Sequence, residues 1–277
     1  MSSFTESIST TLTPISTTNN TISKSPSFGE NTENIVKDVV PSTSPEEIIN
    51  KFRENHPKSI EKVMVFDLET TGKRTSTSYV VQMSYIIYNV KQKTFDKSVD
   101  HIINVGSRVF IPPETIAIHK ITPEISKTQG IPMLDALKEF YDDYLSVDLI
   151  ICHNIKYDIP MIHVELQRHW KSMEKSHPYA LSLFNPTFMK VRGIQSLCTM
   201  LNTTDICCIP NKNPKFSTYK WPSLMELYKT LFTDSPTNLH NSMIDCLVCL
   251  RCYLSIWLND QMTNAEFETH CKQVALR

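Results

Sequence analysis

Residues 65–72 read Val-Phe-Asp-Leu-Glu-Thr-Thr-Gly and place two carboxylates, Asp67 and Glu69, in a segment that otherwise has the pattern of a buried strand. Side chains alternate between the two faces of a strand, so these two share one face, roughly 7 Å apart at about 3.3 Å per residue. Like charges that close repel each other, and burying them is costly without a positive group nearby. Two interpretations stay open: an exposed strand end before a turn at Thr71-Gly72, or two ligands for a divalent cation.

The chain has 277 residues and a formal net charge of −1, so any basic surface that could hold nucleic acid must be local. This length suits one domain with extensions or two small domains. No apolar run is long enough to span a bilayer, and the N-terminal residues lack the basic and apolar regions of a secretory signal. We therefore expect an intracellular protein of the cytoplasm or nucleus, not secreted and without a membrane partner. Its eight cysteines are then expected to be reduced thiols.

The chain divides into three segments by composition. Fifteen of the first 28 residues are Ser or Thr, so residues 1–43 cannot bury a core and are predicted to be a disordered tail. Residues 44–60 are predicted to form a short helical lead-in, because Ser44-Pro45-Glu46-Glu47 has the form of a capping box. Residues 61–277 have an α/β pattern and are predicted to form one domain.

Hydrophobic periodicity predicts the elements of that domain. Strands are expected at 62–69, 79–90, 95–104 and 148–154, and helices at 132–146, 156–170, 223–232, 242–257 and 264–276. The first three strands follow each other closely, which favours antiparallel pairing. Pro160 is expected to interrupt the second of these helices, and residues 171–222 give no clear pattern.

Two later motifs extend the opening one. "HNIKYD" (153–158) follows a buried strand and places Asp158 one turn into a helix, whereas "HNSMID" (240–245) places His240 just before the last long helix and Asp245 in its first turns. Strand ends and helix starts are where open α/β sheets build ligand sites. Four carboxylates that converge on one point need cations to neutralise them, and oxygen ligands of this kind suit Mg²⁺ or Mn²⁺.

The order Asp-x-Glu-x-Thr-Gly, His-Asn-x-x-Tyr-Asp and His-x-x-x-x-Asp resembles the DEDDh group of 3′–5′ exonucleases, which includes RNase T and the proofreading subunit of bacterial DNA polymerase III. The resemblance covers roughly residues 61–257, and "IHKIT" (118–122) and "PSLMELYKTLF" (222–232) support it. It implies an RNase H-like α/β fold, with a mixed five-stranded sheet and helices on both faces. Lys120 stands where the family usually has Gly, and Tyr157 where Phe is common.

The resemblance also implies roles for the five motif residues. Asp67, Glu69 and Asp245 would bind a first Mg²⁺ or Mn²⁺ ion, and Asp67 and Asp158 a second. His240 would be the general base, since its imidazole titrates near neutrality. Together these five would be the catalytic residues of a two-metal-ion phosphodiester hydrolase.

Further positions match the substrate pocket of the family. Thr70, Thr71 and His119 correspond to residues that line the terminal-nucleotide pocket, and Asn154 to one that sometimes lies near the substrate. His153 corresponds to a structural position. Their ordinary interpretation is turn and helix-end geometry.

The implied activity is metal-dependent hydrolysis at 3′ ends of single-stranded DNA or RNA, with release of nucleoside 5′-monophosphates. Two alternatives stay open: a nucleic-acid-binding module or scaffold with this fold but no turnover, and a hydrolase restricted to short oligonucleotides. The presence of all five catalytic residues favours an enzyme. The sequence does not distinguish DNA from RNA, which depends on details of the pocket, and it predicts no particular protein partner.

Two other patterns have both ordinary and functional interpretations. Residues 188–221 interleave basic and aromatic side chains, which either hold a single strand or belong to a solvated loop with local core anchors. Cys246, Cys249 and Cys252 have the spacing Cys-x-x-Cys-x-x-Cys on a predicted helix, where buried thiols are the expected interpretation rather than a metal site.

Overall fold

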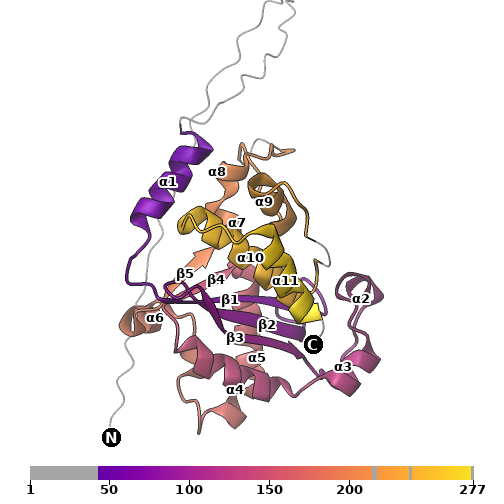
Figure 1. Ribbon diagram of the computed structural model, residues 1–277. Coiled ribbons are helices and arrows are strands. Elements are labelled where there is room, and N and C mark those ends of the chain that lie inside the picture. The colour runs from indigo at the N-terminus through magenta and orange to yellow at the C-terminus, as the bar shows by residue number, and fades with distance from the viewer. Residues whose placement is uncertain (1–42, 214–216, 237–238, 276–277) are drawn as a thin grey trace, which may run out of the picture. The chain divides into compact units, whose positions relative to one another are not determined.

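The computed structural model describes residues 43–213, 217–236 and 239–275 (Figure 1). The predicted disordered tail therefore lies outside the described residues, apart from Thr43. The strands are β1 (Lys62–Thr70), β2 (Val80–Asn89), β3 (Thr94–Ile102), β4 (Leu149–Cys152) and β5 (Gln195–Cys198). The helices are α1 (Pro45–Asn55), α2 (Pro113–His119), α3 (Pro123–Gln129), α4 (Met133–Tyr144), α5 (Ile155–Met173), α6 (Pro186–Arg192), α7 (Thr199–Asn202), α8 (Thr204–Cys207), α9 (Leu224–Leu231), α10 (Ser242–Trp257) and α11 (Asn264–Ala275), with a 3₁₀ turn at Ala180–Ser182.

The five strands form one mixed sheet in the order β3-β2-β1-β4-β5. β1 pairs antiparallel with β2, and β2 with β3, whereas β4 and β5 join parallel to β1 and to each other. The predicted mixed five-stranded α/β fold and the antiparallel pairing of the first three strands are thus confirmed. β5 was not predicted, because it is only four residues long and lies in the stretch without a clear pattern.

Helices cover both faces of the sheet, α4 and α5 on one side and α9 and α10 on the other (Figure 1). The alternation of β1 distributes its residues between two cores: Met64 and Phe66 pack toward α4 and α5, and Val63 and Val65 toward α10. Asp67 and Glu69 follow Val63 and Val65 at alternate positions of the strand, so all four side chains lie on the same face. The strand therefore presents both carboxylates to the face that α10 covers.

α10 is buried along almost its whole length, including Cys246, Cys249 and Cys252. Their thiols pack in the hydrophobic core, as expected for ordinary buried cysteines. Arg251 on the same helix is also buried; it pairs with Asp234 at 3.2 Å and lies 4.2 Å from the Phe232 ring centroid. None of the described helices is long and apolar enough to cross a membrane.

Two helix predictions had different outcomes. The capping box at Ser44 is confirmed: the Ser44 hydroxyl accepts from the Glu47 amide, and the Glu47 carboxylate accepts from the Ser44 amide. The predicted interruption at Pro160 is wrong, because α5 continues through it to Met173. Pro160 lies early in the helix, where the missing N–H costs one bond, to the carbonyl of Lys156.

Candidate active site

The structure brings the sequence motifs together at the ends of three elements. Glu69 near the end of β1, Asp245 in the first turn of α10, and His240 just before that helix have possible ligand atoms within 4.8 Å of one another. Asp67 lies two residues before Glu69 on the same face of β1, and Asp158 lies in the first turn of α5. The first interpretation of the opening motif, a simple exposed strand end, does not fit this convergence.

The electrostatics of the carboxylates show that they are destabilised as anions in the absence of a cation. Burial raises the pKa of Asp67 well above its ordinary value, and the charges of Asp245, Asp158 and Glu69 raise it further. Burial, followed by the charges of Asp245 and Asp158, raises the pKa of Glu69 to about 8.

Asp158 and Asp245 are perturbed in the same direction. Burial raises the pKa of Asp158 to about 7, although the thiol of Cys152 donates to its Oδ2 at 3.1 Å and partly offsets this. Burial also raises the pKa of Asp245 to about 7, although the His240 amide donates to its Oδ2 at 3.2 Å. The other oxygen of Asp245, Oδ1, is buried and has no hydrogen-bond partner among the described residues. An unpaired buried carboxylate oxygen among three other carboxylates fits a divalent cation, which would satisfy both its charge and its lone pairs.

His240 is held in an unusual backbone conformation beside these groups. Its φ is 71°, in the left-handed region that few non-glycine residues adopt. The following residue, Asn241, caps α10 by accepting from the Ile244 amide at 3.2 Å. The turn at His240 thus directs its backbone amide to Asp245 and leaves the residue exposed to solvent.

A polar network behind the carboxylates was missed by the sequence analysis. Gln82 and Ser84 are the β2 residues directly opposite the two carboxylates of β1, and both side chains donate to Asp100 Oδ1 on β3 at 2.7 Å. The hydroxyls of Ser84 and Ser242 are 2.5 Å apart, and because Ser84 donates to Asp100, Ser242 donates to Ser84. The Ser242 amide also points to Gln82 Oε1 at 3.5 Å. These four residues, which we name the polar row, fasten the first turn of α10 to β2.

Comparison with known proteins identifies the family. The sequence model of the exonuclease family that includes RNase T matches residues 64–253. The chain belongs to this exonuclease family. The match covers every catalytic position assigned above, and the family is the DEDDh-type 3′–5′ exonucleases of the RNase H-like superfamily. No curated protein sequence is significantly similar to the chain.

Solved structures show the same fold. E. coli exonuclease I in a zinc-bound complex with single-stranded DNA is 13% identical, with a TM-score of 0.54 over 78% of this chain and 43% of that one. E. coli exonuclease I in complex with a dA16 oligonucleotide is 14% identical, with a TM-score of 0.55 over 76% of this chain and 42% of that one. The chain thus spans less than half of the length of these exonuclease I structures.

The two family departures can be located in the structure. Lys120 ends α2 with φ 65°, so the turn keeps the left-handed conformation for which glycine is best suited. The Tyr157 hydroxyl donates to the Gly72 carbonyl at 2.6 Å and lies 2.5 Å from Thr70 Oγ1, contacts that a Phe in this place would lack. Both departures therefore keep the local geometry, the second with added hydrogen bonds to the turn that follows the carboxylates.

Thr70 and Thr71, the first two predicted substrate residues, use their hydroxyls within that turn. Thr70 Oγ1 lies 2.9 Å from the Gly72 carbonyl, and Thr71 Oγ1 accepts from the Tyr79 amide at 3.0 Å. Both residues are buried. Their contacts fix the turn, and a role toward a nucleotide remains a prediction.

His119 has a free donor. Its Nδ1 accepts from the Ile121 amide at 3.0 Å, which places the proton of the neutral ring on Nε2. That Nε2 is buried and unpaired among the described residues, and burial lowers the pKa of the ring, which keeps it neutral. A buried N–H without a partner is the group that a polar ligand would satisfy.

Asn154 and His153 begin α5 in different ways. Asn154 has φ 81° and its side chain makes no capping bond, so its amide is not committed to the helix. His153 is fully engaged: Nδ1 lies 3.0 Å from Thr199 Oγ1 and Nε2 lies 3.1 Å from the Pro222 carbonyl. Burial lowers the pKa of His153 to about 4, which agrees with a structural, neutral histidine.

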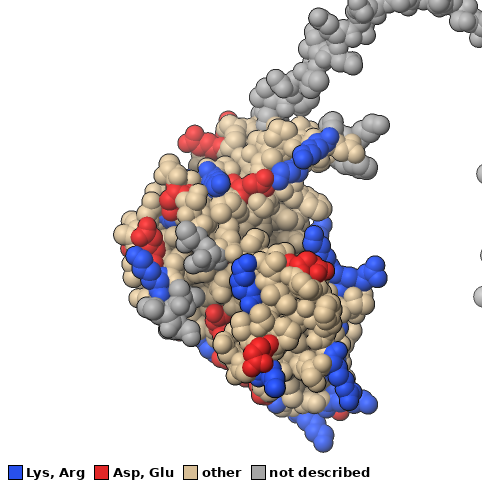
Figure 2. All heavy atoms as spheres, turned by 90° about the vertical axis from the view of Figure 1, so that its right-hand side faces the viewer, with Lys and Arg blue, Asp and Glu red and all other residues tan. Residues whose placement is uncertain are grey.

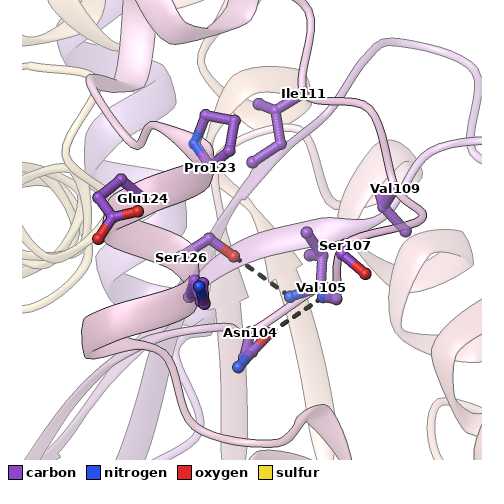
Figure 3. A pocket seen from close by; sticks show the side chains of 10 residues that line it. Asn104, Val105, Ser107, Val109, Ile111, Pro123, Glu124 and Ser126 are labelled. Carbon is purple, nitrogen blue, oxygen red and sulfur yellow. Dashed lines mark hydrogen bonds between the residues drawn. The ribbon is translucent and has the colours of Figure 1, made fainter.

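A separate hollow of about 430 Å³ lies between residues 104–111 and α3 (Figure 3). Its polar groups satisfy one another, since Ser126 Oγ accepts from the Val105 amide and Asn104 Oδ1 from the Gly106 amide. None of the catalytic residues lines it. Among the described residues, both acidic and basic side chains occur on the face in Figure 2.

The basic and aromatic residues of 188–221 differ in their surroundings, and Lys215 and Phe216 lie outside the described residues. Phe188 packs against the core, and Lys220 pairs with Glu226 at 2.7 Å. Trp221, in contrast, is 60% exposed. Phe188 and Lys220 therefore have structural contacts, whereas Lys190, Arg192 and Lys212 are exposed. Binding of a single strand by this stretch remains a prediction.

Proposed function

We propose that this chain is a 3′–5′ exonuclease that hydrolyses phosphodiester bonds at 3′ ends of single-stranded nucleic acid and releases nucleoside 5′-monophosphates. The observation that carries the proposal is the convergence of Glu69, Asp245 and His240, backed by carboxylates whose pKa values are all raised. Family membership supports the reaction class. The similar structures of E. coli exonuclease I, one bound to single-stranded DNA and one to a dA16 oligonucleotide, support the substrate class.

Asp67, Glu69, Asp158 and Asp245 would hold two Mg²⁺ or Mn²⁺ ions. When bound, such a pair supplies positive charge that favours an attacking hydroxide and a departing alkoxide. The unpaired Oδ1 of Asp245 and the raised carboxyl pKa values support this assignment.

His240 would take the proton from the attacking water on a ring nitrogen. It is exposed, so it can exchange that proton with solvent after each cycle. Its backbone bond to Asp245 keeps the imidazole beside the carboxylates. His119 would donate its free Nε2–H to the terminal nucleotide, with Thr70, Thr71 and Asn154 shaping the same pocket.

A digestion assay tests the proposal. Single-stranded DNA and RNA of one sequence, labelled at the 5′ end, are incubated with Mg²⁺, Mn²⁺ or EDTA. We expect ladders that shorten from the 3′ end with either metal, nucleoside 5′-monophosphate as product, and no turnover in EDTA. The faster of the two polymers identifies the substrate. Binding without turnover would instead support a scaffold, and cleavage of only di- and trinucleotides would support a short-oligonucleotide hydrolase.

A further inference from the structure

Trp221 is a large aromatic side chain that remains 60% exposed although it is followed by the buried Pro222 and the start of α9. Exposing an indole forgoes the stabilisation that its burial would give. A cation accompanies it: Lys156 Nζ lies 5.9 Å from the centroid of the Trp221 ring. An exposed ring beside an amine offers the two contacts that a single nucleic acid strand uses, base stacking and phosphate charge.

This pair is tied to the catalytic residues through α5. Lys156 and Asp158 lie two residues apart in the first turn of that helix, about 3 Å along its axis and pointing in nearly opposite directions. Asp158 is therefore buried with the other carboxylates, whereas Lys156 faces solvent. Lys156 thus lies on the solvent side of the helical turn that also carries Asp158.

His153 fixes the backbone next to Trp221. Its imidazole bridges Thr199 Oγ1 and the carbonyl of Pro222, the residue after Trp221. Since both ring nitrogens are used and the ring is neutral, this bridge is a permanent feature rather than a switch. The position of Trp221 relative to the start of α5 is thus set by the same motif that provides Asp158.

We propose that Trp221 and Lys156 form a strand-binding platform, in which the indole stacks on a base of the single strand upstream of the scissile bond and the amine contacts an adjoining phosphate. The inference rests on the proposed function and assigns residues to the substrate strand. Stacking is tolerant of sequence, because every base has a π-face, so the platform holds any sequence.

Kinetics on two substrates test the platform. A single-stranded oligonucleotide reaches it, whereas the p-nitrophenyl ester of thymidine 5′-monophosphate is too short. We expect Trp221→Ala to raise the KM for the oligonucleotide at least about fivefold, the effect of losing one stacked base, with turnover of the ester within about twofold of wild type. Trp221→Phe should keep most of the affinity. Lys156→Ala should raise KM and lower the salt slope of binding by about one.

Matched controls and a binding readout separate the outcomes. Tyr179→Ala removes another aromatic, 62% exposed, and Lys171→Ala removes an exposed lysine near the other end of α5; both should leave KM unchanged. With Ca²⁺ in place of Mg²⁺, oligothymidylate should quench tryptophan fluorescence in the wild type, and this quenching should be lost in Trp221→Phe. An unchanged KM and quenching in the Trp221 variants would overturn the platform, as would equal losses on both substrates. A wild-type protein that hydrolyses neither substrate would instead overturn the proposed function.

Discussion

At the scale of the residue, the alternation of β1 explains why its two carboxylates lie on one face, beside the start of α10. Val63 and Val65 bury against α10, and Asp67 and Glu69 continue along the same face until it meets the first turn of that helix. Four carboxylates packed this closely cost the folded protein free energy while they are charged. The proposed divalent cations would offset this cost.

The stability of the metal-free protein should therefore fall as the pH rises. Glu69 titrates near its ordinary value of 4.5 in the unfolded chain but near 8 in the folded protein. Between these values the folded state binds more protons, so the free energy of unfolding decreases with increasing pH. Thermal melts in EDTA from pH 4 to pH 8 should show this fall, and Mg²⁺ should reverse it.

The substitution Asp245→Asn should flatten that pH dependence, raise the melting temperature in EDTA at pH 8 and abolish turnover. It removes one buried charge and one metal ligand while keeping the shape of the side chain. Glu54→Gln, on the exposed side of α1, is the control and should change none of these. A melting temperature that stays constant or rises with pH in EDTA would contradict the assignment.

His240→Ala should lower kcat by roughly 10²–10⁴-fold, the usual contribution of a positioned proton acceptor. Oligonucleotide binding should change little, because the imidazole is assigned to the water and not to a phosphate. His169→Ala is a control on α5. Near-wild-type kcat with weakened binding would move His240 to substrate anchoring.

At the scale of the element, the sequence predicted the strands and helices that have a clear hydrophobic period and the site residues that lie in ordered motifs. The first three strands, the capped helix at Ser44 and the meeting of Glu69, His240 and Asp245 follow from local patterns in the sequence. The catalytic roles of the five motif residues remain a prediction. β5 could not be predicted, because its residues are mostly polar and not buried, whereas the equally short β4 is an apolar buried run. The polar row was also inaccessible, since Asp100 and Ser242 lie far apart in the sequence and meet only through strand register and helix packing.

We expect substitutions that remove hydrogen bonds of the polar row to lower the affinity for metal ions. Ser242→Ala removes the hydroxyl that bonds to Ser84, and Asp100→Asn weakens the acceptor on which the row ends. Both should loosen the first turn of α10 and lower Mg²⁺ affinity by about 10–100-fold, as measured by calorimetry without substrate. Asp96→Asn is the control, because Asp96 lies on the same strand as Asp100 and forms a salt bridge with Lys62 of β1. Equal Mg²⁺ affinity in all three variants would show that the row is merely structural.

At the scale of the whole molecule, the predicted tail and the predicted lead-in are expected to contribute differently to the stability of the fold. Residues 1–42 lie outside the described part of the chain, and their composition predicts no core. The lead-in 44–60 carries α1, which packs on α10: Phe52 stacks on Trp257 at 5.2 Å, and Arg53 donates to the carbonyls of Ser255 and Ile256. The lead-in thus supports the end of α10 that is opposite to Asp245.

Two truncated chains should therefore behave differently. A chain that starts at Ser44 should keep the kcat and KM of the full-length protein and its melting temperature. A chain that starts at Glu61 loses the Phe52–Trp257 stack, the Arg53 bonds and the 2.7 Å contact between His56 and the Tyr253 hydroxyl. Burial of a side chain such as Phe52 stabilises by about 1.5–3 kcal/mol, and each kcal/mol shifts the melting temperature of a domain this size by about 2–4 °C. We expect a melting temperature at least about 5 °C lower, measured by calorimetry, with some activity retained below it.

Phe52→Ala in the full-length chain should reproduce part of that loss, whereas Lys51→Ala, on the exposed side of α1, should not. Equal melting temperatures for the two truncated chains would mean that α1 is dispensable and that the stable domain begins at residue 61.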